Sequence, residues 1–343
     1  MIIIMIVVIC LIYFRSLLEP LVLSVFIWYL ISAFRNAIGR IKVKGKTFPN
    51  WLQASLAFTI TFFVLWGVWG IISYNVQLII EKAPEYTKNL AGLSAVLSSI
   101  PYLDRLPGVE DLDTFILNNL SNIDIQGSVG AVINSLSSIV GNLALILIYV
   151  IFMLIEENLI PKKMEAVFQN SDKKGRMQDI LQHIGKSINT YFTVKTSMSL
   201  LTGFLSYIIL LFFGLDFAVL WAFLIFLFNY IPYVGSLGAT LLPSLFAVFQ
   251  FASFWPFLWI LLSVSAVQVF VGNYIEPKVV GKTLNLSPLV VIVALSFWGS
   301  IWGIVGMILS VPIISVLVII MSHFPSSRNI AILFSEQGSI ENY

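Results

Sequence analysis

Long stretches without charge are the feature of this sequence that most restricts its fold. Five runs contain no Asp, Glu, Lys or Arg, and they are residues 51–80, 137–155, 196–215, 217–275 and 283–322. A helix of about 20 residues crosses the ~30 Å hydrocarbon layer of a membrane. Only 10% of the chain is charged and 59% is apolar, whereas soluble domains carry about 25% charged residues. We therefore expect an all-α, polytopic membrane protein.

The segments between these runs differ in charge, and this difference predicts the orientation. Residues 39–50 carry four basic and no acidic side chains, and residues 156–195 carry seven basic side chains. Basic loops are retained in the cytoplasm, so we expect both segments and both chain termini there. Residues 81–136 carry three basic side chains among seven acids, which predicts an extracytoplasmic segment. The runs 51–80 and 137–155 then each cross the membrane.

The N-terminal region predicts a transmembrane hairpin within residues 1–38. Arg15, Glu19 and Pro20 interrupt its apolar sequence. Charge and proline together predict a tight turn between two short helices at this point.

Two segments outside the spans carry apolar stripes at helical spacing. The extracytoplasmic stripe is Val109, Leu112, Ile116 and Leu120, and the cytoplasmic stripe is Ile180, Leu181, Ile184, Ile188, Tyr191 and Phe192. The first predicts a helix that rests on the membrane surface, with partner binding as the alternative. The second predicts packing on the chain's own bundle, with coupling or oligomerisation as alternatives.

The region 196–322 contains two units of similar build, 196–250 and 253–322. Each unit has an apolar helix, a short arm, a Gly-x-x-Gly pair and a second arm that contains proline. The glycine pairs are Gly235 with Gly238 and Gly303 with Gly306. This weak repeat predicts a C-terminal transport unit of two similar halves.

The arms of these units are short. The arm 286–298 would extend roughly 20 Å as a helix, less than the ~30 Å hydrocarbon layer. Glycine and proline breaks at membrane depth are tolerated only where protein or water surrounds them. We therefore expect two broken-helix or re-entrant hairpins, which form an inverted repeat if they enter from opposite sides. Six ordinary close-packed helices are the alternative.

Four strings in this region resemble the autoinducer-2 exporter family of bacterial membrane proteins. They begin at Asn229 (NYIPYVG), Gly272 (GNYIEPKVVG), Leu286 (LSPLVV) and Gly303 (GIVGMILSVP). The resemblance implies a multi-pass inner-membrane permease, with autoinducer-2 export in some members and sodium/proton exchange in others. The family signature falls on Pro232, Gly235, Glu276, Pro277, Gly281, Pro288, Gly303, Gly306 and Pro312. Val271 stands where many relatives have an acid, which weakens a cation-coupling role for that position.

Uncharged amides are the strongest polar candidates inside the predicted spans. Asn229, Gln268 and Asn273 can donate and accept hydrogen bonds to hydroxyls or carbonyls. For each, a bond between helices is the alternative. Gln268 and Asn273 are about 140° apart on an ideal helix, so we expect them on different faces. The predicted substrate pathway is Asn229, Pro232, Gly235, Gly238, Gln268, Asn273, Gly303 and Gly306. Leucine at Gly235 or Gly306 is expected to impair transport more than insertion.

Glu276 and Asp216 are the candidates for ion coupling. Pro277 biases Glu276 away from helical backbone, so we expect the span to end there with its carboxylate paired to Lys278 or Lys282. An interfacial ion pair is the alternative to ion binding at Glu276. For Asp216, an N-cap of the following arm is the alternative to coupling.

Other chemistry finds little support in the sequence. Gly281 and Lys282 resemble part of a phosphate-binding loop, but Glu276 occupies the position of its first glycine. Cys10, His183 and His323 are isolated, so we expect no metal, no cofactor and no enzyme activity. A net charge of +2 gives no indication of nucleic-acid binding.

The leading hypothesis is a membrane transporter that exports a small polar metabolite, with autoinducer-2 taken from the resemblance. A Na⁺ or Li⁺/proton antiporter is the first alternative, and a non-transporting membrane scaffold is the second. The expected partners are membrane lipid and a small polar substrate or monovalent cation, and a homo-oligomer is left open.

Overall fold

The computed structural model describes residues 2–43, 46–90, 142–157, 159–167, 171–280, 285–336 and 338. These residues are mainly helical, with one antiparallel pair of short strands and a bridge between Leu286 and Ser335. The elements are α1 (Ile2–Tyr13), α2 (Arg15–Gly39), β1 (Lys42–Val43), β2 (Lys46–Thr47), α3 (Asn50–Leu90), α7 (Leu143–Glu157), α8 (Ile160–Val167), α9 (Ser171–Phe212), α10 (Ala218–Phe228), α11 (Val234–Phe251), α12 (Phe254–Val269), the π-helix η2 (Phe270–Ile275), α13 (Glu276–Val280), α14 (Pro288–Ser322) and α15 (Arg328–Phe334).

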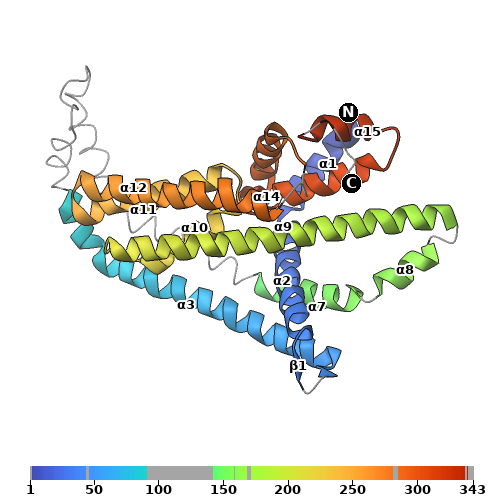
Figure 1. Cartoon of the computed structure of the whole chain (residues 1–343), viewed down its shortest axis with the longest axis horizontal. Helices are drawn as coiled ribbons and strands as arrows, with labels where there is room; N and C mark the ends of the chain where they lie inside the picture. The colour runs from blue at the N-terminus through green and yellow to red at the C-terminus, as the bar shows by residue number, and fades with distance from the viewer. Residues whose placement is uncertain are drawn as a thin grey trace.

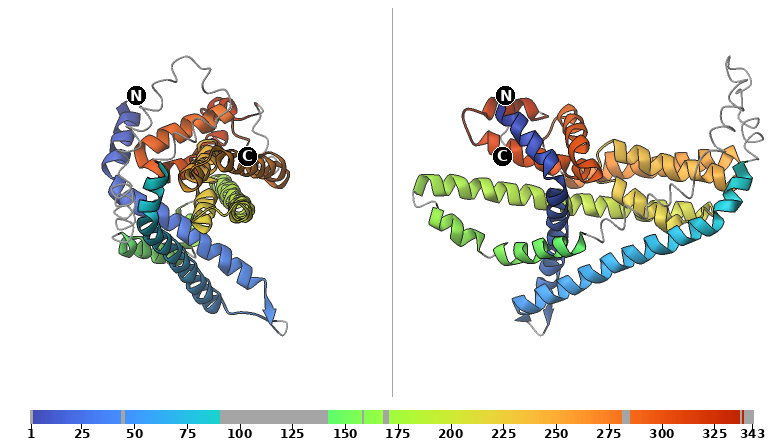
Figure 2. Two further views of the ribbon diagram at one scale, coloured as in Figure 1. Left: turned by 90° about the vertical axis from the view of Figure 1, so that its left-hand side faces the viewer. Right: turned by 180° about the vertical axis from the view of Figure 1, so that it is seen from behind.

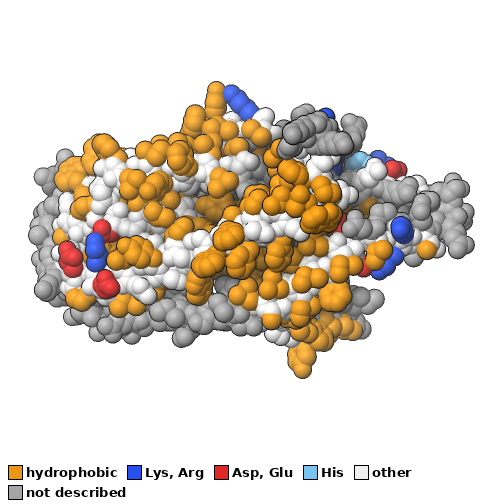
Figure 3. All heavy atoms as spheres, turned by 90° about the horizontal axis from the view of Figure 1, so that it is seen from below, with side chains coloured by type: hydrophobic (Ala, Val, Ile, Leu, Met, Phe, Trp, Pro, Cys, Tyr) orange, Lys and Arg blue, Asp and Glu red, His pale blue; other side chains and the backbone are white. Residues whose placement is uncertain are grey.

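The expectation of an all-helical membrane protein is confirmed. Six helices in the described part of the chain are long and apolar enough to cross a membrane. Many large apolar side chains remain exposed, including Trp66 at 60% and Phe212 at 84%. Figure 3 shows hydrophobic side chains across much of one face, with charged side chains toward its two ends. Apolar patches of this extent are favourable in lipid and unfavourable in water.

Helix α9 is the central element of the arrangement. It runs along the middle of the molecule, with α11 and α12 packed side by side on one flank (Figure 1). Helix α3 packs against α2 in its N-terminal part and reaches α10 and α11 near its C-terminal end (Figure 2). Helix α3 therefore links α2 of the N-terminal region to α10 and α11 of the C-terminal unit.

The predicted tight turn around Arg15, Glu19 and Pro20 is wrong. The helical break lies at Phe14, and all three residues are inside α2. Arg15 Nε donates to Glu19 Oε1 at 2.8 Å. A charge pair four residues apart stabilises helical backbone, so this pair favours the first turn of a helix over a chain reversal.

Helices α3 and α9 are longer than the predicted spans. Helix α3 continues past residue 80 to Leu90, and α9 is one helix from Ser171 to Phe212. The predicted cytoplasmic segment therefore runs directly into the first helix of the C-terminal unit. Ile180, Tyr191 and Phe192 of the cytoplasmic stripe are buried. The extracytoplasmic stripe and residues 137–141 lie outside the described residues.

The two Gly-x-x-Gly pairs lie at breaks in helical structure, a turn in the first unit and a kink within α14 in the second. A turn joins α10 to α11, and α14 loses helical backbone at Trp302 and Gly303, where the φ of Gly303 is 60°. A Cβ at Gly235 would lie 1.8 Å from the Phe228 carbonyl oxygen, and one at Gly306 would lie 2.0 Å from that of Trp298. In both halves, the second arm therefore packs directly on the backbone of the first arm.

This close approach corrects the expected effect of leucine at these glycines. The clash begins at Cβ and involves backbone, which cannot move away as a flexible side chain can. Substitution is therefore expected to disturb folding first, before any effect on transport.

Candidate functional site

Four parts of the C-terminal unit line a partly open pocket of about 450 Å³. They are the middle of α9, the α10–α11 turn, the segment from α12 to α13, and α14. The lining residues include Tyr191, Lys195, Asn229, Pro232, Tyr233, Ser236, Gln268, Gly272, Asn273, Glu276, Val291 and Val311. We call this the central pocket. Of the predicted site residues, it brings together Asn229, Pro232, Gln268, Asn273 and Glu276.

An ion pair between α9 and α13 forms part of the wall of the central pocket. Lys195 Nζ donates to both carboxylate oxygens of Glu276, at 2.9 and 3.2 Å. The two side chains are only 13% and 23% exposed. The expected pairing of Glu276 with Lys278 is wrong, because the Lys278 ammonium lies 3.6 Å from the centre of the Tyr274 ring. Lys282 lies outside the described residues.

The helix does not end at Glu276 as expected, because a π-helix precedes it. Glu276 has helical backbone (φ −54°, ψ −49°) and donates its backbone N–H to the carbonyl of Val271. A proline normally clashes with the carbonyl four residues earlier and removes one hydrogen bond. The hydrogen bonds of a π-helix span five residues instead of four, and with this wider backbone ahead of Pro277 the chain continues as α13 to Val280.

Gln268 and Asn273 line the same pocket, although they do not share a narrow face of the helix. On an ideal α-helix the two side chains would diverge. The π-helix has more residues per turn than an α-helix, so residues five apart come closer to the same face.

Two polar atoms at the central pocket lack protein partners. The hydroxyl of Tyr191 and Nε2 of Gln268 are buried and form no hydrogen bond within the described residues. Tyr191 is 8% exposed. Buried polar groups are nearly always hydrogen-bonded, so each such atom requires an explanation.

The α10–α11 turn is tied to α9 by two polar contacts. Asn229 Nδ2 donates to Ser199 Oγ at 3.1 Å, and the hydroxyls of Tyr230 and Thr196 are 2.7 Å apart. Asn229 therefore forms a hydrogen bond between helices, which was the alternative to ligand contact. It also lines the central pocket.

Asp216 lies far from the central pocket, near the other end of α9. The helical distance from Lys195 to the end of α9 at Phe212 is roughly 26 Å at 1.5 Å per residue. Asp216 Oδ2 accepts hydrogen bonds from Lys82 Nζ (2.7 Å) and the Tyr86 hydroxyl (2.8 Å). The N-cap of α10 is Phe217, without a side-chain cap bond, so the N-cap expectation for Asp216 is wrong. The Asp216 carboxylate instead accepts hydrogen bonds from two side chains of α3.

The remaining signature residues have structural positions away from the pocket lining. Pro288 begins α14, where its missing N–H costs no hydrogen bond. Pro312 is buried inside α14. Gly238, Gly303 and Gly306 do not line the central pocket, and neither does Gly235. Gly281 lies outside the described residues.

Sequence reasoning missed Lys195 and Tyr191 as pocket residues. Tyr191 was assigned to a packing stripe, and Lys195 was treated as the boundary of a span. The sequence does contain a signal for Lys195, because it directly precedes the long charge-free run 196–215. A cation that becomes buried at such a position needs a partner of opposite charge. Nothing local to Tyr191 distinguishes it from an ordinary core residue.

The fold and the pocket define a multi-pass α-helical membrane protein with a partly open pocket of mixed polarity between its C-terminal helices. Residues 1–326 match the profile described as AI-2E family transporter. The chain belongs to this family of transporters.

Individual relatives cover nearly the whole chain. A "Putative transport protein" of Haemophilus influenzae is 30% identical over 329 residues, which cover 96% of this chain and 92% of the relative. The AI-2 transport protein TqsA of Escherichia coli is 27% identical over 336 residues, which cover 97% and 93%. A protein of Borreliella burgdorferi with the same name as the Haemophilus relative is 26% identical over 334 residues, covering 96% and 87%.

Proposed function

We propose that this protein exports a small, uncharged polar molecule and binds it in the central pocket. The observation that carries the proposal is the pair of unpartnered groups at this pocket, the Tyr191 hydroxyl and Gln268 Nε2. Lys195 and Glu276 neutralise each other within the same wall. Both atoms are buried in the substrate-free structure, so the two side chains would have to turn toward the pocket when a molecule binds. A molecule with hydroxyl or carbonyl oxygens would then satisfy both groups and add no charge. Asn229, Asn273 and Pro232 complete the proposed contact surface.

We further propose that the segments around the two breaks work as hairpins that enter from opposite membrane faces. The first comprises α10 and α11, and the second comprises the two arms of α14. The matched contacts of Gly235 and Gly306 support their equivalence. Inverted repeats of this kind place a substrate site near the membrane centre and expose it alternately. In this arrangement the protein lies in a bacterial inner membrane with both termini in the cytoplasm.

Autoinducer-2 is the first substrate to test. The Escherichia coli relative is named as an AI-2 transport protein, and a furanone carries the hydrogen-bonding oxygens that the pocket would recognise. Proteoliposomes that contain the purified protein should release autoinducer-2 faster than protein-free liposomes. Absence of flux with autoinducer-2 and with other small polyols would contradict the proposal.

Cation/proton antiport is the alternative function, in which the carboxylates would bind the transported ions. Both Glu276 and Asp216 bind a lysine in the structure, so a cation would have to displace an ammonium group. Sodium-dependent proton flux that disappears in Glu276→Gln would favour this alternative. A scaffold without transport activity predicts no flux of any kind, and a large effect from deletion of residues 105–125.

Gly272 offers a way to fill the central pocket without disturbing packing. It lines the cavity, and a Cβ there would meet no atom within 4 Å. We expect Gly272→Leu to reduce autoinducer-2 flux at least tenfold, because the side chain would occupy substrate space, while the melting temperature stays within about 3 °C of the wild type. Gly185→Leu is the matched control, since Gly185 also faces open space but lies outside the pocket. Equal flux in the two variants would contradict the site.

Tyr191→Phe tests the unpartnered hydroxyl alone. One hydrogen bond contributes about 0.5–1.5 kcal/mol, so we expect the KM for autoinducer-2 to rise about two- to twelvefold. The stability of the substrate-free protein should not fall, because no protein bond is lost. A lower melting temperature with unchanged KM would assign the hydroxyl a structural role instead.

A further inference from the structure

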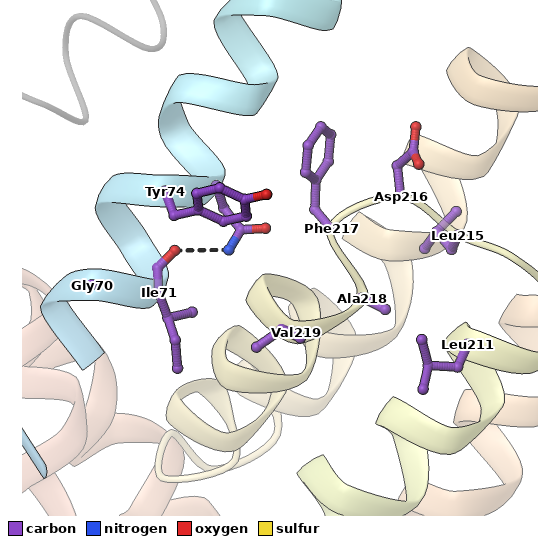
Figure 4. Close-up of a pocket in the computed structure, with 10 residues that line it drawn as sticks. Gly70, Ile71, Tyr74, Leu211, Leu215, Asp216, Phe217, Ala218 and Val219 are labelled. Carbon is purple, nitrogen blue, oxygen red and sulfur yellow. Dashed lines mark hydrogen bonds between the residues drawn. The ribbon is translucent and has the colours of Figure 1, made fainter. Parts of the chain in front are cut away.

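A second cavity lies between α3 and the α9–α10 turn, at a distance from the central pocket. Its volume is about 570 Å³. Figure 4 shows Ile71 and Tyr74 on the α3 wall and Leu211, Phe217 and Val219 on the facing wall. Leu211, Tyr74 and Val219 remain substantially exposed, so the cavity is open to the surroundings of the helices. We call it the α3 groove.

The α3 groove is mainly apolar, apart from Asn75, whose Nδ2 donates to the Ile71 carbonyl at 2.7 Å, and it is polar at one end. Asp216 closes that end, where it binds Lys82 and Tyr86 from the following turns of α3. The Lys82 side chain is 40% exposed, so its other N–H groups can reach a further acceptor. Both α3 donors bind Oδ2 of Asp216, which leaves Oδ1 for a donor from a ligand within the described surroundings.

The groove and the polar contacts beyond it together extend over about one leaflet of a membrane. Gly70 lines the groove and Lys82 lies beyond its lining residues, and the two are separated by roughly 18 Å along α3 at 1.5 Å per residue, whereas half of the hydrocarbon layer is about 15 Å. Lys82 lies four residues before the end of the apolar span Asn50–Tyr86, and Asp216 lies four residues after the span that ends at Phe212. In a membrane that covers these spans, the polar end would lie at headgroup level and the apolar end would lie within the acyl chains.

We propose that the α3 groove binds a phospholipid with a primary-amine headgroup, of the phosphatidylethanolamine type. The acyl chain would lie between Ile71, Tyr74 and the α9–α10 turn. The phosphate would accept from Lys82, and the ammonium would donate to Asp216. Glu81 and Glu85 are also exposed on this part of α3, so the local charge disfavours an anionic headgroup and favours a zwitterionic one with N–H donors.

Two neighbouring glycines of α3 provide the test. A Cβ at Gly70 or at Gly67 would meet no atom within 4 Å, and only Gly70 lines the groove. We expect the full-length protein, purified in mild detergent, to retain phosphatidylethanolamine in native mass spectra. Added phosphatidylethanolamine should raise its melting temperature by about 2–4 °C, more than phosphatidylglycerol or phosphatidylcholine does. Gly70→Leu should lose both the retained lipid and the shift, and Gly67→Leu should keep both.

Several outcomes would overturn the proposal. Retention of the same lipid in Gly70→Leu would place it elsewhere, and an equal shift with phosphatidylglycerol would contradict the headgroup assignment. A shift with inorganic phosphate alone would show an ion site. A change of oligomeric state in Gly70→Leu with unchanged lipid would mean that a second copy covers the groove. Lys82→Gln checks the headgroup contact separately and should reduce the preference for phosphatidylethanolamine without removing acyl-chain binding.

Discussion

Alanine at Gly235 or Gly306 should unfold the C-terminal unit, although it adds a single methyl group. The new Cβ would lie 1.8 Å from the Phe228 carbonyl oxygen or 2.0 Å from that of Trp298. Carbon and oxygen atoms that are not bonded cannot approach this closely, so the arms must separate. Overpacking in a well-packed core costs about 1–3 kcal/mol, and a backbone clash lies at or above the upper end of this range. We expect little folded protein after purification, measured by size-exclusion chromatography and thermal unfolding.

Gly238→Ala is the matched control for this prediction. Gly238 lies three residues from Gly235 on the same helix, and a Cβ there would lie 3.9 Å from the Phe228 ring, an ordinary contact. This variant should express and unfold like the wild type, or be slightly more stable, since alanine favours helix over glycine by up to about 1 kcal/mol. A well-folded Gly235→Ala protein with the stability of Gly238→Ala would contradict the close approach of the two arms.

Breaking the Lys195–Glu276 pair should give the second large effect. Glu276→Gln leaves an ammonium group that is 13% exposed without a counter-charge, and Lys195→Met leaves a carboxylate that is 23% exposed. Removal of one member of a buried pair costs about 3–5 kcal/mol, and partial exposure reduces this to about 2–3 kcal/mol. We expect both single variants to lose much of their thermal stability in detergent, and their flux with it.

The double variant Lys195→Met/Glu276→Gln separates charge balance from other roles. It removes both charges, so most of the lost stability should return, with a coupling energy of about 1–3 kcal/mol in the double-mutant cycle. Flux of a neutral substrate should return as well. If the stability losses simply add, the two residues do not act as a pair. If stability returns but flux does not, the charges take part in transport itself.

The sequence was sufficient to predict the class of protein and several pocket residues. Charge-free runs long enough to span a membrane are a local property, and six long apolar helices confirm the multi-span prediction. Asn229, Gln268 and Asn273 could be selected because polar side chains are rare within such runs. The glycine pairs also indicated where helical structure is interrupted, at the α10–α11 turn and at the kink in α14.

Tertiary structure decided which of these residues meet, and with which partners. Lys195 and Glu276 are 81 positions apart, and Lys82 and Asp216 are 134 positions apart, so no local pattern relates them. A π-helix directly precedes the Glu276–Pro277 pair, and Gln268 and Asn273 line one cavity together with residues of α9 and α14. Hydropathy and spacing act along the chain, whereas ion pairs, close backbone contacts and cavities depend on how distant helices pack. The sequence therefore determined that the chain enters a membrane, and packing determined where its polar groups come together.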